Sequence, residues 1–148
     1  MNRKIEFRGK CSHCDAWAYG NLVDYDDGEA PEIHGFDPYR EGDEVWREIT
    51  VDPDTVGQYI GRTDCDGTPI YEGDIITVNG KYPKVVKYID EWCAFCVANI
   101  DDLKDPCMST WDDACIYKLP TPDWWCNTNR KIKVIGNIYD NQDLLNKK

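Results

Sequence analysis

The sequence contains few of the residues from which most enzyme active sites are built. Its only histidines are His13 and His34, and its only serines are Ser12 and Ser109. Neither serine lies in the Gly-x-Ser-x-Gly turn of a serine hydrolase, and no glycine-rich loop of the kinds that bind phosphate or dinucleotides occurs. A thiol nucleophile needs a nearby base, and nothing in the sequence places His34 beside a cysteine. We therefore expect a protein that is not an enzyme.

Long apolar runs are also missing. The longest is far shorter than the roughly 20 residues that a membrane-spanning helix needs. No apolar segment follows the charged N-terminal residues, so we expect no signal peptide. Hydrophobic residues make up 41% of the 148 residues and charged residues 30%, which is typical of a soluble globular protein. A chain of this length has room for one domain, and we predict a single domain over residues 1–148.

Acidic residues outnumber basic ones, 28 to 17, and the excess lies in one region. Between residues 15 and 54 there are 13 acidic and two basic residues, a net charge of −11, whereas the rest of the chain is neutral. Such a charge disfavours binding to nucleic-acid phosphates. Within this region, residues 24–44 contain prolines and glycines and are predicted to be an acidic, loop-rich segment.

Three interpretations of the acidic region between residues 15 and 54 stay open. It can be a solvated loop, a negative field for a basic partner, as in a nucleic-acid mimic, or a set of carboxylates that binds cations. A calcium loop is disfavoured because Gly28 stands where the fifth-position ligand belongs. The candidate interaction residues of this segment are Asp24, Asp26, Asp27 and Glu29.

Alternating apolar and polar residues with tight-turn signals predict a mostly β protein. The expected strands cover 3–8, 17–23, 45–51, 75–78, 85–89, 92–100 and 131–139. Asp66-Gly67 and Asn79-Gly80 predict tight turns, and the second joins two strands into a hairpin. One short C-terminal helix is expected through Leu144 and Leu145, with Asp140 or Asn141 as its cap. Residues 99–127 hold three prolines and predict a long irregular insertion. These elements favour a small barrel or roll.

Several segments in this order resemble the YopX-like family of bacteriophage and prophage proteins. The segments are Phe7–Lys10, Trp17–Gly20, Val51–Gly61, Ile70–Ile76 and Val134–Asn141, followed by Leu144 and Leu145. The resemblance implies an SH3-like barrel with additional strands, encoded by a phage or prophage and acting in the cytoplasm of a bacterial host. It implies no catalytic residue, because the family has no established biochemical activity.

The residues of these motifs are expected to have structural roles. They are Gly57, Gln58, Tyr59, Tyr71, Glu72, Gly73, Asp74, Gly136 and Asn137. Glu72 and Asp74 flank a glycine at the entry to a strand. Paired carboxylates there could act in acid–base catalysis or bind a metal, but closing a turn by accepting backbone hydrogen bonds is the more common role.

Eight cysteines are many for a protein of a reducing compartment. Cys11 and Cys14 form one Cys-x-x-Cys pair, and Cys93 and Cys96 form another, so a four-thiolate zinc site is a candidate. Against it, the second pair lies in an expected strand, where residues three apart face opposite sides. The alternative is a set of buried, inert thiols: Cys65, Cys93, Cys96 and Cys115.

The chain is rich in aromatic residues, with six tryptophans and nine tyrosines. Trp111, Trp124 and Trp125 fall within the expected irregular insertion. They are interaction candidates if they are exposed, and they form a lid over the core if they are buried.

The sequence favours a non-catalytic binding module that engages a host or phage protein, or a second copy of itself. The alternatives are an acidic nucleic-acid mimic that inhibits a basic host protein, and a zinc-binding protein that uses the two cysteine pairs. No cofactor other than zinc is expected. Direct nucleic-acid binding is disfavoured and would need a local basic patch made by Lys81, Lys84, Lys87, Arg130, Lys131 and Lys133.

Overall fold

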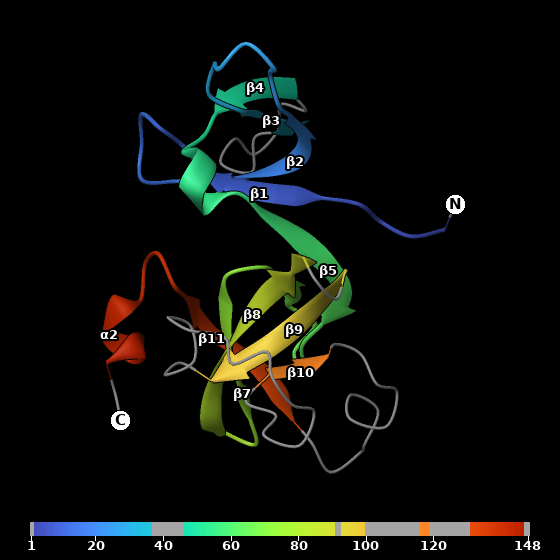
Figure 1. The fold of residues 1–148 in the computed structure, drawn as a ribbon, viewed down its shortest axis with the longest axis vertical. Helices are drawn as coiled ribbons and strands as arrows, with labels where there is room; N and C mark the ends of the chain where they lie inside the picture. Colours follow the sequence, from blue (N-terminus) through green and yellow to red (C-terminus); the bar gives the residue numbers. More distant parts are fainter. Residues whose placement is uncertain (1, 37–45, 91–92, 100–115, 119–130, 147–148) are drawn as a thin grey trace. The chain divides into compact units, whose positions relative to one another are not determined.

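The computed structural model describes residues 2–36, 46–90, 93–99, 116–118 and 131–146, and this part of the chain is mostly β (Figure 1). The elements in chain order are β1 (Phe7–Lys10), β2 (Trp17–Val23), β3 (Glu32–Phe36), β4 (Trp46–Thr50), the 3-10 helix η1 (Pro53–Thr55), β5 (Gly57–Thr63), β6 (Pro69–Tyr71), β7 (Asp74–Val78), β8 (Lys81–Ile89), β9 (Ala94–Asn99), β10 (Ile116–Lys118), β11 (Ile132–Asn137) and α2 (Gln142–Leu145).

The strands form two antiparallel sheets, in the orders β4-β3-β2-β1-β5-β6 and β10-β9-β8-β7-β11. The expected mostly β fold with one short C-terminal helix is confirmed. Both sheets are open as described, so the fold resembles a roll more than a closed barrel. Within the part of the chain that the structure describes, no helix has the length and apolar composition needed to cross a membrane.

The chain divides into two compact units, residues 1–61 and 62–148, and the division falls within β5. Each unit is described by itself below. The prediction of one domain over residues 1–148 stays a prediction.

The core of the first unit lies on one face of its sheet. Ile33 on β3 is fully buried, and it pairs with Leu22 on β2 and with Ile49 on β4. These three residues pack in one cluster with Ala18 and Val51. Because successive side chains of a strand point to opposite faces, the burial of Ile33 and Ile49 turns their sequence neighbours toward the other face.

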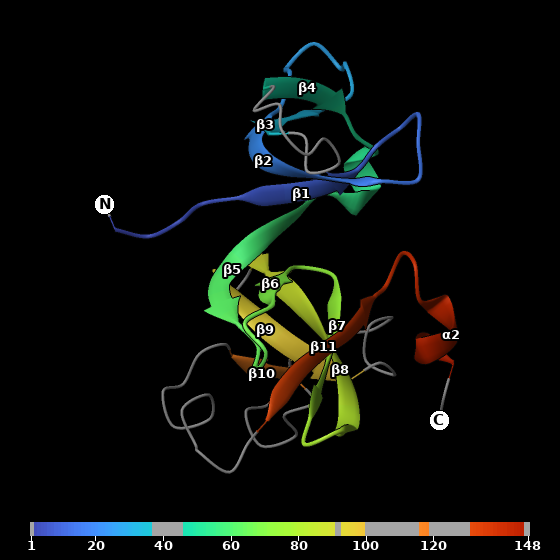
Figure 2. The same ribbon diagram turned by 180° about the vertical axis from the view of Figure 1, so that it is seen from behind.

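The second unit has its core around β7. Ile75 and Ile76 are consecutive and both fully buried, so this strand is covered on both of its faces. Figure 2 shows β11 running along β7, and the register pairs Val134 with Ile76. A smaller apolar cluster joins Ile89 and Cys96 on the neighbouring strands β8 and β9.

Two of the turns follow directly from local chemistry. Asn79 and Gly80 have φ values of 52° and 72° and connect β7 to β8, as the Asn-Gly dipeptide predicts. Gly73, between β6 and β7, has φ 85°, and a Cβ there would lie 2.9 Å from the ring of Tyr139. Glycine is therefore required at position 73 by both its conformation and its neighbour.

Residues 24–44 are predicted to be loop-rich, and the structure describes one strand among them that the prediction lacked, β3 over Glu32–Phe36. This strand forms because Ile33 pairs with residues on both neighbouring strands, a stabilisation that composition does not reveal. The first expected strand begins at Phe7 and not at Arg3. Within the expected insertion 99–127, the structure describes Asn99 at the end of β9 and the strand β10, which pairs with β9. The other residues of that insertion lie outside the described residues.

The C-terminal helix begins with Asn141 in the cap position, but the Asn141 side chain makes no capping hydrogen bond. Its Oδ1 instead accepts from the Asn137 N–H at 3.0 Å. The expected capping by this side chain is therefore wrong, because the asparagine closes the turn between β11 and the helix.

Candidate functional site

The first unit presents a row of polar side chains on the sheet face opposite its core. Glu32 and His34 alternate with the buried Ile33 on β3, and Glu48 on β4 lies directly across from His34. One ligand atom from each of the three polar residues lies within 4.8 Å of the other two. Glu32 and His34 are half-buried and Glu48 is exposed. We call Glu32, His34 and Glu48 the strand cluster.

Two hydrogen bonds orient Glu32. His34 Nε2 lies 2.9 Å from Glu32 Oε2, and the Tyr25 hydroxyl donates to the same oxygen at 2.8 Å. The bond from His34, followed by the one from Tyr25, lowers the pKa of the Glu32 carboxyl, so this group is ionised. An ionised carboxylate only accepts hydrogen bonds, so His34 Nε2 carries a proton in this arrangement. The bond to Glu32 in turn raises the pKa of Tyr25.

The connection between β2 and β3 carries four more carboxylates, and we call it the acidic turn. Its acidic residues, all exposed, are Asp24, Asp26, Asp27 and Glu29. Asp27 Oδ1 accepts from the Glu29 N–H at 3.1 Å, which closes the turn. Among the described residues, no lysine, arginine or histidine forms an ion pair with any of the four. The acidic turn and the strand cluster together make this unit strongly negative.

The four candidate interaction acids of the acidic segment are thus brought together at one turn, next in sequence to the strand cluster. Sequence reasoning missed Glu32, His34 and Glu48 as a group. The signal that could have found them is the pattern Glu-Ile-His, which places two ligand-type side chains on one face of a strand. The contribution of Glu48 requires the register of β4 against β3.

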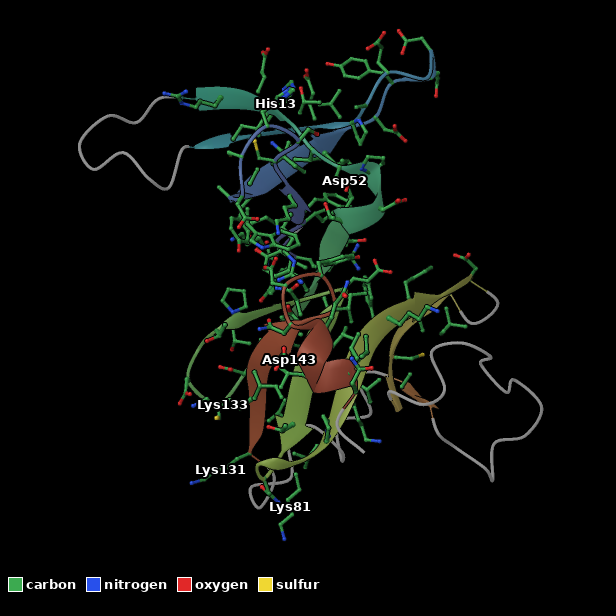
Figure 3. The ribbon with its side chains drawn as sticks, turned by 90° about the vertical axis from the view of Figure 1, so that its left-hand side faces the viewer. His13, Asp52, Lys81, Lys131, Lys133 and Asp143 are labelled. Atoms are coloured by element: carbon green, nitrogen blue, oxygen red, sulfur yellow. The ribbon has the colours of Figure 1, made fainter. Side chains whose placement is uncertain are left out.

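The cysteine pair Cys11–Cys14 lies in the turn between β1 and β2, which also holds His13 (Figure 3). Partial burial acts to raise the pKa of the Cys11 thiol, but hydrogen bonds from the Cys14 thiol and from the His13 and Cys14 amides outweigh it, so the pKa is lowered. The same thiol–thiol bond raises the pKa of Cys14. These bonds favour a thiolate at Cys11 with Cys14 as its donor.

The second pair has a different environment. Cys93 is exposed, and its Sγ donates to the Asp90 carbonyl at 3.4 Å. Cys96 is fully buried beside Ile89 and Ala98, which is the environment of an inert structural thiol. The prediction of burial is correct for Cys96 and wrong for Cys93 and for Cys65, which are both exposed. Cys115 lies outside the described residues. A zinc site made by both pairs stays a prediction.

Among the motif residues named in the sequence analysis, Glu72 and Asp74 lie in and beside the turn that connects β6 to β7. Asp74 is 2% exposed, and its Oδ2 accepts from the Tyr71 N–H at 2.8 Å, while Glu72 accepts from the Tyr88 N–H. The bond to Asp74 closes the turn between β6 and β7, whereas the bond to Glu72 links this turn to β8. Gly57 pairs with Arg8 across β5 and β1.

The remaining motif residues make similar contacts. Gln58 pairs with Phe7, and the Tyr59 N–H donates to the Glu6 carbonyl at 2.8 Å. Asn137 Oδ1 accepts from the backbone N–H groups of Tyr139 and Asp140 after β11. Gly136 lies beside the Asn141 side chain in this same turn.

Asp64 is a structural carboxylate that sequence reasoning missed. It is 8% exposed and accepts from the backbone N–H groups of Asp66, Thr68 and Val134. The bonds from Asp66 and Thr68 are local and close the turn before β6. The bond from Val134 connects this turn to β11. An aspartate two residues before an Asp-Gly turn is the signal that could have indicated it.

In the candidate basic patch, one lysine is paired with a carboxylate and another is buried. Figure 3 shows Lys81, Lys131 and Lys133 at one end of the second unit. Lys133 Nζ forms an ion pair with Asp66 at 3.2 Å, which raises the pKa of the lysine. Lys84, a further member of the expected patch, is buried, so it does not contribute to an exposed basic surface. Trp111, Trp124 and Trp125, as well as Arg130, lie outside the described residues.

The fold and this site define a small, mostly β protein with an acidic, exposed face on one of its sheets. The chain belongs to the YopX protein family, whose model matches residues 6–146. A crystal structure of protein EF1440 from Enterococcus faecalis is similar in fold, with a TM-score of 0.52 and 16% sequence identity, over 97% of this chain and 99% of that one. No curated protein matches this chain.

Proposed function

We propose that this protein is a non-catalytic binding module that engages a protein partner with a basic surface through the acidic turn. The observation that carries the proposal is the group of four exposed carboxylates on that turn, which form no ion pair with a lysine, arginine or histidine among the described residues. The family resemblance adds the setting: a phage or prophage accessory protein that acts in the cytoplasm of a bacterial host.

The charge distribution supports this kind of recognition. Residues 1–61 contain 14 acidic and six basic residues, a net charge of −8, so most of the total of −11 belongs to the first unit. Clustered charge of one sign steers a partner of opposite sign and raises its association rate. Exposed ion pairs add about 1 kcal/mol or less each, so a group of four contributes through their sum.

The test compares capture of proteins from a bacterial lysate by three tagged baits. They are the wild type, a turn variant with Asp24→Asn, Asp26→Asn, Asp27→Asn and Glu29→Gln, and a control variant with Asp15→Asn, Asp54→Asn, Asp90→Asn and Asp143→Asn. Both variants raise the net charge by four, from −11 to −7. The control therefore separates the position of the charge from its amount.

We expect the wild type and the control variant to capture the same basic protein, and the turn variant to lose it. Capture should also weaken steeply as salt rises, since exposed charges are screened. Equal capture by all three baits would refute the role of the acidic turn. Capture of no protein above background by the wild type would refute the binding function itself.

A further inference from the structure

We propose that Glu32, His34 and Glu48 form a binding site for a divalent transition-metal ion, with zinc as the best match. The strand cluster brings two carboxylates and one imidazole from two adjacent strands to one point on the sheet surface. The proposal does not depend on the partner-binding function, although both use the negative face of the first unit.

The distances suit a single ion. The three ligand atoms lie within 4.8 Å of one another, and His34 Nε2 is already 2.9 Å from Glu32 Oε2. Ligands about 2.1 Å from a tetrahedral zinc ion are about 3.4 Å apart. The contact between His34 and Glu32 therefore opens by about half an ångström, and Glu48 closes in by a side-chain rotation.

The sheet holds the backbone of the site in place. β3 is paired on both sides, with β2 and with β4. Ile33 lies between the two β3 ligands and is fully buried, and its partner Ile49 is next to Glu48. Directly opposed residues on antiparallel strands have Cβ atoms about 5 Å apart, so His34 and Glu48 need little movement to share an ion. Sites on such elements are more precise than sites on loops.

Neighbouring groups support a bound cation. The Tyr25 hydroxyl donates to Glu32 Oε2 and orients this carboxylate, and such hydrogen bonds to ligating carboxylates are common around metal ions. The acidic turn adds negative charge close by, which raises the local concentration of cations. The basic residue on β4, Arg47, is adjacent in sequence to Glu48 and so belongs to the opposite face of the strand.

The ligand set selects the class of ion. Imidazole favours zinc and its transition-metal neighbours, whereas magnesium and calcium prefer oxygen ligands throughout. Three protein ligands leave at least one position for water or for a group of another molecule. When the ion binds, His34 changes tautomer: its proton moves from Nε2 to Nδ1 by exchange with water, and Nε2 becomes free to ligate. The hydrogen bond between His34 and Glu32 is then replaced by two bonds to the metal.

The test measures zinc binding to the purified full-length chain by titration calorimetry, with cobalt(II) absorption as a second readout. The two ligand variants are Glu48→Gln and His34→Gln. Glu48 accepts no hydrogen bond among the described residues, so Glu48→Gln is the variant that leaves the fold intact, and circular dichroism checks this. The controls are His13→Gln, which removes the other histidine, and the double variant Cys11→Ser/Cys14→Ser, which removes the thiol pair.

We expect one zinc ion to bind the wild type and both controls with similar affinity, and each ligand variant to bind at least about tenfold more weakly. The cobalt spectrum should lack the strong sulfur-to-metal charge-transfer band of thiolate ligation. The proposal is overturned if the wild type binds no zinc, if the ligand variants bind as the wild type does, or if the cysteine variant loses the binding.

The turn variant of the capture experiment separates this proposal from the proposed function. It retains all three ligands of the strand cluster, so it should bind one zinc ion while it loses the partner. Zinc failing to bind any of these proteins overturns the metal site and leaves the capture result standing. Loss of capture with intact zinc binding shows that the acidic turn acts in partner binding by itself.

Discussion

Replacement of Asp64 should weaken the second unit in a way that depends on pH. The two carboxylate oxygens accept three backbone hydrogen bonds, at 2.9 Å from Asp66, 2.9 Å from Thr68 and 3.0 Å from Val134. Hydrogen bonds to charged groups contribute about 1.5–3 kcal/mol each when buried. Asp66 and Thr68 are exposed residues, so water can replace much of the hydrogen bonding that their N–H groups lose, whereas Val134 is half-buried.

For Asp64→Ala we therefore expect a loss of about 2–4 kcal/mol in the free energy of unfolding. Asp64→Asn should lose somewhat less stability than Asp64→Ala, because the asparagine side chain keeps one acceptor oxygen. It still loses some stability, because its N–H₂ group cannot accept from the remaining backbone N–H donor. The measurement is urea unfolding at neutral pH, followed by circular dichroism. Asp54→Asn is the matched control, since its exposed carboxylate accepts no hydrogen bond among the described residues.

The pH dependence follows from the direction of the pKa shift. Burial acts to raise the pKa of Asp64, but the bonds from Val134, Thr68 and Asp66 outweigh it and leave the pKa lowered. In acid the unfolded chain therefore binds a proton that the folded chain does not, so stability rises with pH. The contribution is fully present above the unfolded pKa of about 3.9 and is lost as the pH falls through the folded pKa.

The difference in stability between the wild type and Asp64→Asn should therefore shrink as the pH is lowered below about 4. A difference that is constant from neutral pH into this range would refute the charge-assisted account. A loss equal to that of Asp54→Asn would refute the structural role altogether.

Two further predictions concern the turns. Gly73→Ala should cost more stability than Gly28→Ala, because both positions have positive φ but only a Cβ at position 73 meets the Tyr139 ring, at 2.9 Å. In thermal or urea unfolding we expect a loss of about 1–2 kcal/mol for Gly28→Ala from the backbone alone, and a larger loss for Gly73→Ala. Equal losses would contradict the contact with Tyr139. Cys14→Ala should raise the pH at which Cys11 becomes alkylated by iodoacetamide, because it removes the thiol donor that lowers the pKa of Cys11. An unchanged pH profile would contradict this, and would show that the backbone amides are sufficient to lower the pKa of Cys11.

Some parts of the fold were open to prediction because the information is local. The turn at Asn79–Gly80 depends on the ease with which these two residues adopt positive φ, and they do so at 52° and 72°. The strands at 17–23 and 46–50 follow from alternation of apolar and polar side chains. In each case a short window of sequence holds the physical cause.

Other parts were missed because their cause is distant in the chain. β3 lies within an acidic segment that the sequence predicts to be loop-rich. It is stabilised by the packing of Ile33 against Leu22 and Ile49 on the neighbouring strands. The identical spacing of the two Cys-x-x-Cys pairs hides a difference in environment. Cys14 is exposed in a turn, whereas Cys96 is buried in a strand beside an apolar cluster.

The amino-acid sequence by itself determined the mostly β class, the positions of the tight turns and the concentration of negative charge in the N-terminal part. Those properties depend on residue type and on near neighbours. Only the tertiary structure decided which acidic residues meet. Glu48 joins Glu32 and His34 because the register of β4 against β3 places it there. The burial of Ile33 and Ile49 in the core holds that register. A shift of one residue would move every apolar side chain of the strand from the core face to the solvent-exposed face.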